Sequence, residues 1–167
     1  MAITQKHADA LIQQLHVLLV DDSPYMRKIV RGLLTSIGVR RVSEAGDGIA
    51  ALEKIREDAP DVIVLDWEMP LLNGPEMVRI VRSPGVFPTP DIPIIMLTAH
   101  GQVSRVRESM RLGVNEFLCK PVSAKALFER LVSIMLKPRA NVKAGKCYGP
   151  PSRLKAGEPS DPTPSET

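Results

Sequence analysis

The stretch "IVLDWEMPLLNGPE" (residues 63–76) joins a run of branched aliphatic residues to an aspartate, Asp66, and then to the turn Asn73-Gly74-Pro75. Aliphatic residues without polar alternation are typical of a strand that is buried on both faces of a parallel sheet. A glycine followed by a proline suits the first turn of a helix. The stretch therefore predicts a buried strand with an acid at its carboxyl end, followed by a helix.

The same succession of apolar run and helical segment recurs along the chain. Most of the apolar runs are rich in branched aliphatic residues, and the segments between them repeat apolar residues at three- and four-residue spacing. Strand and helix alternate throughout, so the sequence predicts an α/β protein with a doubly wound parallel sheet and right-handed crossovers. The predicted strands are 16–20, 40–45, 61–65, 92–97 and 116–119, and the predicted helices are 24–37, 48–58, 74–82, 102–112 and 123–136.

Two terminal segments lie outside this pattern. We expect residues 1–14 to form an N-terminal extension in which 4–14 can make a short helix, and residues 15–137 to form the domain. From Pro138 onward the chain is rich in proline and glycine and has almost no apolar periodicity, which predicts a disordered tail over 138–167. The proline-rich loop 83–91 is longer than such a connection needs, and a contact with a partner is one interpretation of it.

Composition excludes several classes of protein. The chain has 167 residues, 44% hydrophobic and 25% charged, which fits one globular domain, and its net charge of +3 is too small to favour nucleic acid as the main partner. The two cysteines, Cys119 and Cys147, lie far apart and form no metal-binding pair, a usage that suits a reducing compartment. The N-terminus lacks a long apolar segment, so we expect neither signal peptide nor membrane span, and a cytoplasmic location.

Charged and hydroxyl side chains follow four of the five apolar runs. Asp21 and Asp22 follow the first run, Asp66 the third, Thr98 the fourth and Lys120 the fifth. Ligands of open parallel sheets bind beyond the carboxyl ends of the strands, where these side chains would meet. Each residue alone has an ordinary structural explanation, such as a helix start, a turn or a surface cation. No fold requires all of them at one edge, however, so together they predict a binding site.

Electrostatics indicates the chemistry of such a site. Two like charges ~4 Å apart repel by roughly 4 kcal/mol at an effective dielectric near 20, so three carboxylates need a cation. Oxygen ligands favour a hard divalent ion, Mg²⁺ or also Mn²⁺, over zinc. A metal and Lys120 around one carboxylate suit a phosphoryl group. We therefore interpret Asp66 as a nucleophile presented at the end of its strand.

These motifs resemble those of the receiver domains of two-component response regulators, most closely the single-domain, chemotaxis-type members. The resemblance covers about residues 15–136 and rests on "LLVDDSPYMRKIVRGLL", "DVIVLDWEMPLLNGPE", "IPIIMLTAH" and "FLCKP", in the family's order and spacing. It implies a flavodoxin-like receiver fold with five helices and a five-stranded parallel sheet of order 2-1-3-4-5. It also implies a signalling protein that catalyses its own phosphorylation and slow dephosphorylation.

The resemblance implies a role for each acidic residue and for the lysine. Asp66 would accept the phosphoryl group from a histidine kinase or a histidine phosphotransfer protein. Asp22 would bind Mg²⁺ directly, Asp21 largely through water, and the backbone carbonyl of Glu68 would complete the metal ligands. Lys120 would contact the phosphoryl oxygens.

Further positions would carry the switch. Thr98 would move to bond the phosphoryl group with Phe117 turning inward behind it, and the Lys120–Pro121 peptide bond would be cis. Glu68 and His100 would tune the lifetime of the phosphoryl group. For Phe117 a plain role in the strand core stays open, as does that of an idle surface residue for His100. The output face, formed by the fourth helix, fifth strand and fifth helix, would bind a downstream protein target, in a monomer or a phosphorylation-dependent dimer.

Two enzyme-like alternatives fit less well. A phosphatase of the haloacid dehalogenase type also uses an aspartyl nucleophile with Mg²⁺, but it needs an aspartate where this chain has Glu68. The segment "AGDGIA" (45–50) is neither a dinucleotide fingerprint nor a P-loop, which argues against a nucleotide site.

The tail is too short and polar to bury a second core, so we expect no DNA-binding output domain. The sequence thus predicts a stand-alone response regulator.

Overall fold

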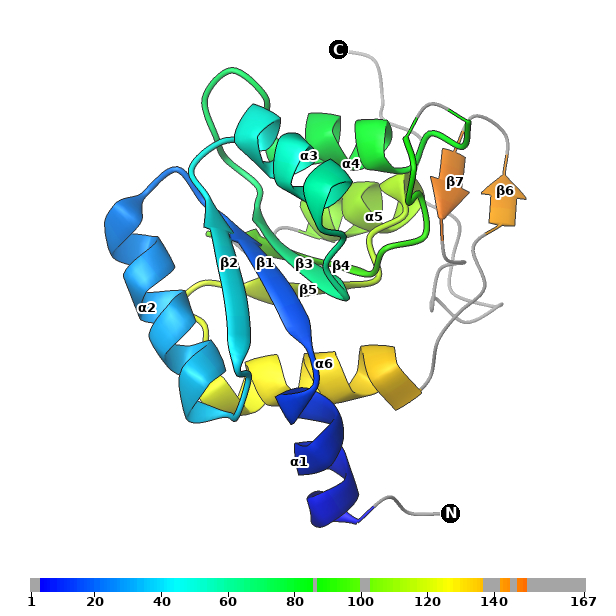
Figure 1. Cartoon of the computed structure of the whole chain (residues 1–167). Helices are drawn as coiled ribbons and strands as arrows, with labels where there is room; N and C mark the ends of the chain where they lie inside the picture. Colours follow the sequence, from blue (N-terminus) through cyan, green and yellow to red (C-terminus); the bar gives the residue numbers. More distant parts are fainter. Residues whose placement is uncertain (1–3, 86, 100–102, 137–141, 145–146, 150–167) are drawn as a thin grey trace.

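The computed structural model describes residues 4–85, 87–99, 103–136, 142–144 and 147–149, and its centre is a five-stranded parallel sheet (Figure 1). The strands are ordered β2-β1-β3-β4-β5, which confirms the doubly wound sheet. Register places Val20 opposite Leu65, and Asp66 opposite Leu97, so the carboxyl ends of the central strands lie level with one another. The strands are β1 (His16–Val20), β2 (Arg41–Ala45), β3 (Val62–Asp66), β4 (Ile94–Thr98) and β5 (Glu116–Cys119).

Helices follow each strand at the predicted places, with one more helix in front of β1. The Ser23 side chain accepts a hydrogen bond from the Met26 backbone, which caps the second helix. Asn73 and Glu76 form a reciprocal capping box that fixes the start of the fourth helix directly behind the loop after β3. The helices are α1 (Gln5–Gln13), α2 (Pro24–Ser36), α3 (Gly48–Glu57), α4 (Gly74–Val81), α5 (Val103–Leu112) and α6 (Ala124–Leu136).

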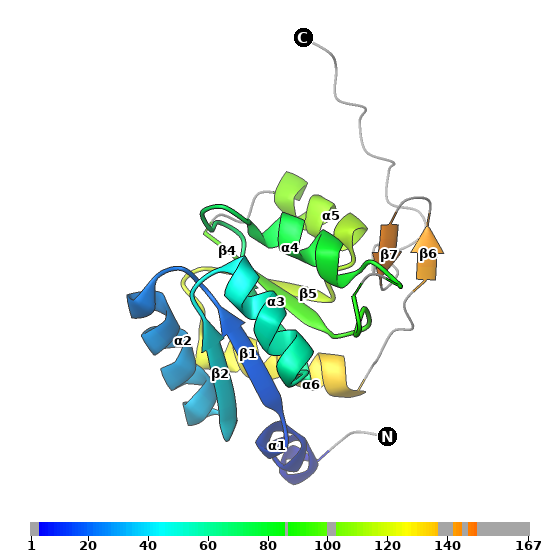
Figure 2. The ribbon, with the colours of Figure 1, turned by 45° about the horizontal axis from the view of Figure 1, so that its top comes forward.

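Side chains of β1 alternate between two hydrophobic layers, one on each face of the sheet. Leu18 and Val20 belong to the core cluster that includes residues of α3, α4 and α5, whereas Val17 and Leu19 belong to the cluster with α1, α2 and α6. Figures 1 and 2 show these two groups of helices on opposite faces. Both faces of β1 are therefore buried, which explains its unbroken run of aliphatic residues; each such side chain stabilises the fold by about 1.5–3 kcal/mol.

A buried arginine fastens the long connection between α4 and β4. Arg82 is only 3% exposed, and its guanidinium donates hydrogen bonds to the backbone carbonyls of Pro90, Ile92 and Gly113 and to the side-chain oxygen of Asn115. These bonds join the end of α4, the loop before β4 and the turn before β5. The loop is thereby held to the body of the domain, and its role as a partner contact stays a prediction.

Two short strands lie within the segment for which the sequence predicted disorder. β6 (Val142–Ala144) and β7 (Cys147–Gly149) pair in antiparallel register, and β7 contacts α5 (Figures 1 and 2). Strands of three residues are too short to produce a recognisable apolar pattern, so they could not be predicted from the sequence. The division of the chain into extension, domain and tail stays a prediction. Across the described ranges, no helix combines the length and apolarity needed to cross a membrane.

Candidate functional site

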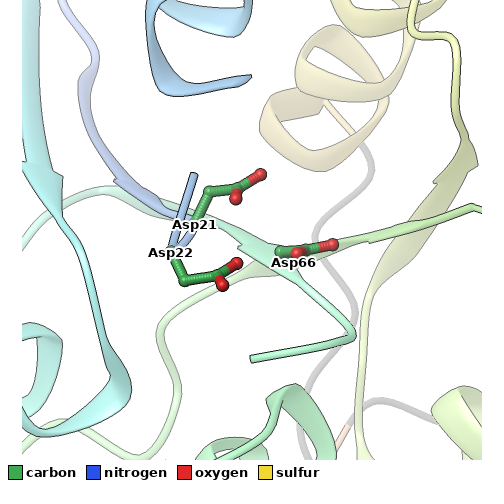
Figure 3. A group of neighbouring side chains, drawn as sticks. All are labelled: Asp21, Asp22 and Asp66. Carbon is green, nitrogen blue, oxygen red and sulfur yellow. The ribbon is translucent and has the colours of Figure 1, made fainter. Parts of the chain in front are cut away.

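Three carboxylates meet at the carboxyl edge of the sheet. Asp66 is the last residue of β3, the central strand, and Asp21 and Asp22 directly follow its neighbour β1. One oxygen from each carboxylate lies within 4.8 Å of the other two, and Figure 3 shows the side chains extending from the two strand ends into one region. Asp21 and Asp66 are buried, whereas Asp22 is exposed. The sequence prediction that these acids converge is confirmed.

The main chain around Asp21 is held from two sides. Its backbone N–H donates to the carbonyl of Ala45 in β2, and its side-chain Oδ1 accepts from the backbone of Ser23 at 2.9 Å. Arg27 on α2 donates from Nη1 to the carbonyl of Asp21 at 2.7 Å, and its Nε lies 3.6 Å from the Glu44 carboxylate. Sequence reasoning missed Arg27 and Glu44. The only available signal was a basic residue in the first turn of the helix that follows the acid pair.

Lys120 brings a positive charge into the acidic cluster. Its Nζ lies 3.0 Å from Asp66 Oδ1 and 3.6 Å from Asp21 Oδ2. Burial alone would lower the pKa of Lys120, but the hydrogen bond and charge of Asp66, with the charge of Asp21, outweigh burial and raise that pKa. Lys120 is therefore protonated throughout the physiological pH range and is placed to contact an anionic group on Asp66.

Burial governs the titration of Asp66. Desolvation raises the pKa of Asp66, the hydrogen bond and charge of Lys120 lower it, and the charges of Asp21 and Asp22 raise it further. The net result is a pKa above the ordinary value of 3.8. The positive charge of Lys120 therefore does not fully offset the burial of the ionised Asp66 carboxylate and its repulsion by the neighbouring acids. An additional cation at the site would stabilise the ionised carboxylate.

Two of the other predicted positions, Thr98 and Lys120, are joined by a backbone hydrogen bond at the ends of β4 and β5. Thr98 ends β4 and is buried, and its backbone carbonyl accepts a hydrogen bond from the Lys120 N–H at 2.7 Å. Phe117 in β5 is half-buried against the core, which fits its alternative role in the strand. The Lys120–Pro121 peptide bond is cis, as the resemblance implied. Glu68 is exposed, and His100 lies outside the described residues.

A shallow cleft opens beside the cluster along the loop after β3. At one side of this cleft the main chain of Gly74 lies very close to the end of β3. Only glycine fits there, because a Cβ atom would lie 2.6 Å from the carbonyl oxygen of Asp66 and 3.0 Å from Cα of Trp67. The first residue of α4 can therefore lie directly against the main chain at the end of β3. The cleft has a volume of about 490 Å³ and is lined by Asp22, Trp67, Glu68, Met69, Pro70 and Asn73.

The donor set fits a hard divalent cation. Buried Asp21 Oδ2 has no hydrogen-bond partner among the described residues, so it retains the capacity to face a cation or a water that a cation binds. The available ligands are carboxylate oxygens, with no sulfur or imidazole in the cluster. A cation here would offset the mutual repulsion of the acids, and Lys120 would remain free to neutralise a second, anionic ligand.

The open parallel sheet, the acids at its central strand ends and the buried lysine together define a flavodoxin-like α/β protein with a pocket for a cation and an anion. A family model, the response regulator receiver domain, matches residues 17–132, and the chain belongs to this family. The match argues against the phosphatase alternative, because it accounts for the whole sheet and the acidic cluster within a signalling domain.

Two of the relatives are named chemotaxis proteins, and a third is a CheY in a complex. Chemotaxis protein CheY1 of Helicobacter pylori is 38% identical over 120 residues, which are 71% of this chain and 95% of that protein. The solved structure of chemotaxis protein CheY4 of Vibrio cholerae is 34% identical, with a TM-score of 0.63 over 70% of this chain and 95% of that one. A CheX–CheY–beryllofluoride–Mg²⁺ complex from Borrelia burgdorferi has a TM-score of 0.66 and 26% identity, over 74% of this chain and 90% of that one.

Proposed function

We propose that this chain is a response regulator in which Asp66 accepts a phosphoryl group from a histidine kinase or a histidine phosphotransfer protein. The observation that supports this most directly is the position of Asp66. It ends the central strand, 3.0 Å from the Lys120 ammonium and within 4.8 Å of two further carboxylates. A cytoplasmic location, expected from the sequence, is part of the same proposal.

Asp21, Asp22 and the backbone carbonyl of Glu68 would hold Mg²⁺ together with Asp66. When bound, the metal supplies positive charge that offsets the charge on the transferred group. A carboxylate oxygen of Asp66 forms a bond to phosphorus as the bond from phosphorus to the donor histidine nitrogen breaks, and that nitrogen keeps the electron pair. Lys120 contributes a further positive charge beside Asp66. Water later hydrolyses the acyl phosphate, with Glu68 and His100 setting its access.

The signal would leave through protein contacts. Thr98 gains a charge-assisted hydrogen bond only when Asp66 is phosphorylated, and this difference shifts a two-state equilibrium. Phe117 would turn inward as Thr98 moves, which changes the face formed by α5, β5 and α6. The Borrelia complex, in which a CheY is bound to CheX with beryllofluoride and Mg²⁺, supports a downstream protein target that recognises the activated form. The activated protein would act as a monomer or as a dimer formed on phosphorylation.

The test is the transfer of one phosphoryl group from a small-molecule phosphodonor such as acetyl phosphate, followed by mass spectrometry. We expect the full chain to gain one phosphoryl group with Mg²⁺ and none with EDTA. Asp66→Asn should gain none, and Glu53→Gln, which changes an exposed carboxylate of α3, should behave as the wild type. Labelling of Asp66→Asn to the wild-type extent would rule out Asp66 as the acceptor. Lys120→Ala should still bind Mg²⁺ but lose the fluorescence response of Trp67 to beryllofluoride.

A further inference from the structure

The β6–β7 pair is a feature that the receiver family does not supply. It lies beyond the residues 17–132 that match the family. A separate alignment of 120 residues, 71% of this chain, already spans 95% of the Helicobacter relative. In the structure β7 nevertheless contacts α5, and both Figures 1 and 2 show the strand pair beside that helix. The two strands β6 and β7 follow the last helix of the family fold in sequence, and β7 lies against α5.

The contact with α5 is needed for this strand pair to persist. Each strand has only three residues, and Val142, Lys143 and Ala144 pair with Gly149, Tyr148 and Cys147, respectively. A lone two-stranded hairpin is marginally stable in water and requires packing against another element. The pair joins no other described strand, and β7 contacts α5, so packing against α5 can supply the support that such a pair requires. Formation of the pair and the conformation of α5 are thus energetically linked.

α5 is one of the three elements of the proposed output face, together with β5 and α6. It packs on α4 at one flank and on β5 in the sheet beneath, and β7 contacts it as well. A protein partner that docks on the α5–β5–α6 face and the strand β7 would both contact α5. Occupancy of α5 by the segment 142–149 and by a partner would then exclude one another.

We propose that the β6–β7 pair is an intramolecular ligand of α5 that covers part of the output face and stabilises the unphosphorylated conformation. This inference rests on the proposed function, since it assigns a regulator to the same switch. Phosphorylation of Asp66 would weaken the contact, and loss of the contact would in turn favour the phosphorylated conformation, because coupling between two sites is reciprocal. The partner of the activated protein then binds a surface that the chain itself protects at rest.

The first measurement is amide hydrogen exchange of the full-length protein without ligand. Tyr148→Pro places a proline in the middle of β7, where it disrupts the ladder, and Lys143→Pro does the same in β6. Both variants should exchange faster than the wild type over 142–149 and over 103–112. Ser160→Pro, a proline in the same tail outside the strand pair, should leave both segments unchanged. Unchanged exchange over 103–112 in both strand variants would overturn the proposed contact.

The second measurement is the affinity for beryllofluoride in saturating Mg²⁺, read from Trp67 fluorescence. Tyr148→Pro and Lys143→Pro should bind beryllofluoride about 5-fold more tightly than the wild type or Ser160→Pro, the lower end of typical coupling between sites. Equal or weaker affinity in the strand variants would overturn the inference while leaving the proposed function intact. No response in any of the proteins, the wild type included, would instead count against the proposed function itself.

Discussion

Replacing Asp66 by asparagine should stabilise the metal-free protein. At an effective dielectric of ~20, charges 4.8 Å apart repel by about 3.5 kcal/mol, and Asp66 faces two carboxylates within that distance. The Lys120 ammonium, 3.0 Å from Asp66, attracts the Asp66 carboxylate by about 5.5 kcal/mol at the same dielectric. Because Asp22 is exposed, its repulsion is weakened by solvent, so attraction and repulsion nearly cancel. The remaining difference is the cost of burying a charged carboxylate, which a neutral amide avoids. We therefore expect Asp66→Asn to raise the free energy of unfolding by about 1 kcal/mol.

Mg²⁺ should reverse the order of stability. A ligand that binds only the folded protein stabilises it by about 2.7 kcal/mol at 100 times its dissociation constant. The wild type should gain this amount, and Asp66→Asn, which lacks one ligand charge, should gain much less. Urea denaturation of both proteins in EDTA and in saturating Mg²⁺ measures all four free energies, with Glu53→Gln as the control for loss of an exposed carboxylate.

Acidification should narrow the difference between the metal-free proteins. The pKa of Asp66 is raised in the folded protein, so between the unfolded value near 3.8 and that raised pKa the folded state binds more protons than the unfolded chain. The wild type therefore gains stability relative to Asp66→Asn as the pH falls from 7 through this window. A variant less stable than the wild type in EDTA at pH 7, or a gap that widens on acidification, would refute the reasoning.

Three further substitutions test the surroundings of the site. Gly74→Ala should lower the free energy of unfolding by about 1–3 kcal/mol and weaken Mg²⁺ binding, since its Cβ would lie 2.6 Å from the Asp66 carbonyl oxygen; urea and Mg²⁺ titrations measure both. Leu71 has φ 67° and is 92% exposed, so Leu71→Asn should stabilise by about 1 kcal/mol in thermal denaturation. Arg82→Met removes the donor to four oxygens, three of them buried, and should destabilise by about 3 kcal/mol or more; a loss under 1 kcal/mol in urea would contradict the role given to Arg82.

The sheet and the core of the site could be predicted from the sequence because they depend on local patterns. A strand buried on both faces needs an unbroken aliphatic run, so 61–65 predicted β3 to within one residue of its observed bounds. Parallel strands end at a common edge, so the residues that follow each run, such as Asp21, Asp66 and Lys120, had to lie close together.

The features that the sequence did not predict depend on side-chain geometry or on very short elements. Arg27 reaches the carbonyl of Asp21 only because α2 packs with that side facing β2, which no spacing rule specifies. Arg82 is a buried arginine that donates to four oxygens, whereas its residue type normally indicates the surface. Leu71 adopts a backbone conformation that leucine rarely takes, and β6 and β7 are too short to show a period.

The strand order separates the chemistry from the surfaces that partners would use. Asp66 belongs to the middle strand, which is flanked by β1 and β4, whereas α5 and the β6–β7 pair lie toward the β5 edge. Only β4 stands between β3 and β5, so any influence of the acceptor on that edge through the sheet crosses a single strand. Changes in the outer elements can therefore alter the surface that a partner contacts without changing the central strands that carry Asp66. β4 is constrained from both sides, because it pairs with β3 and with β5.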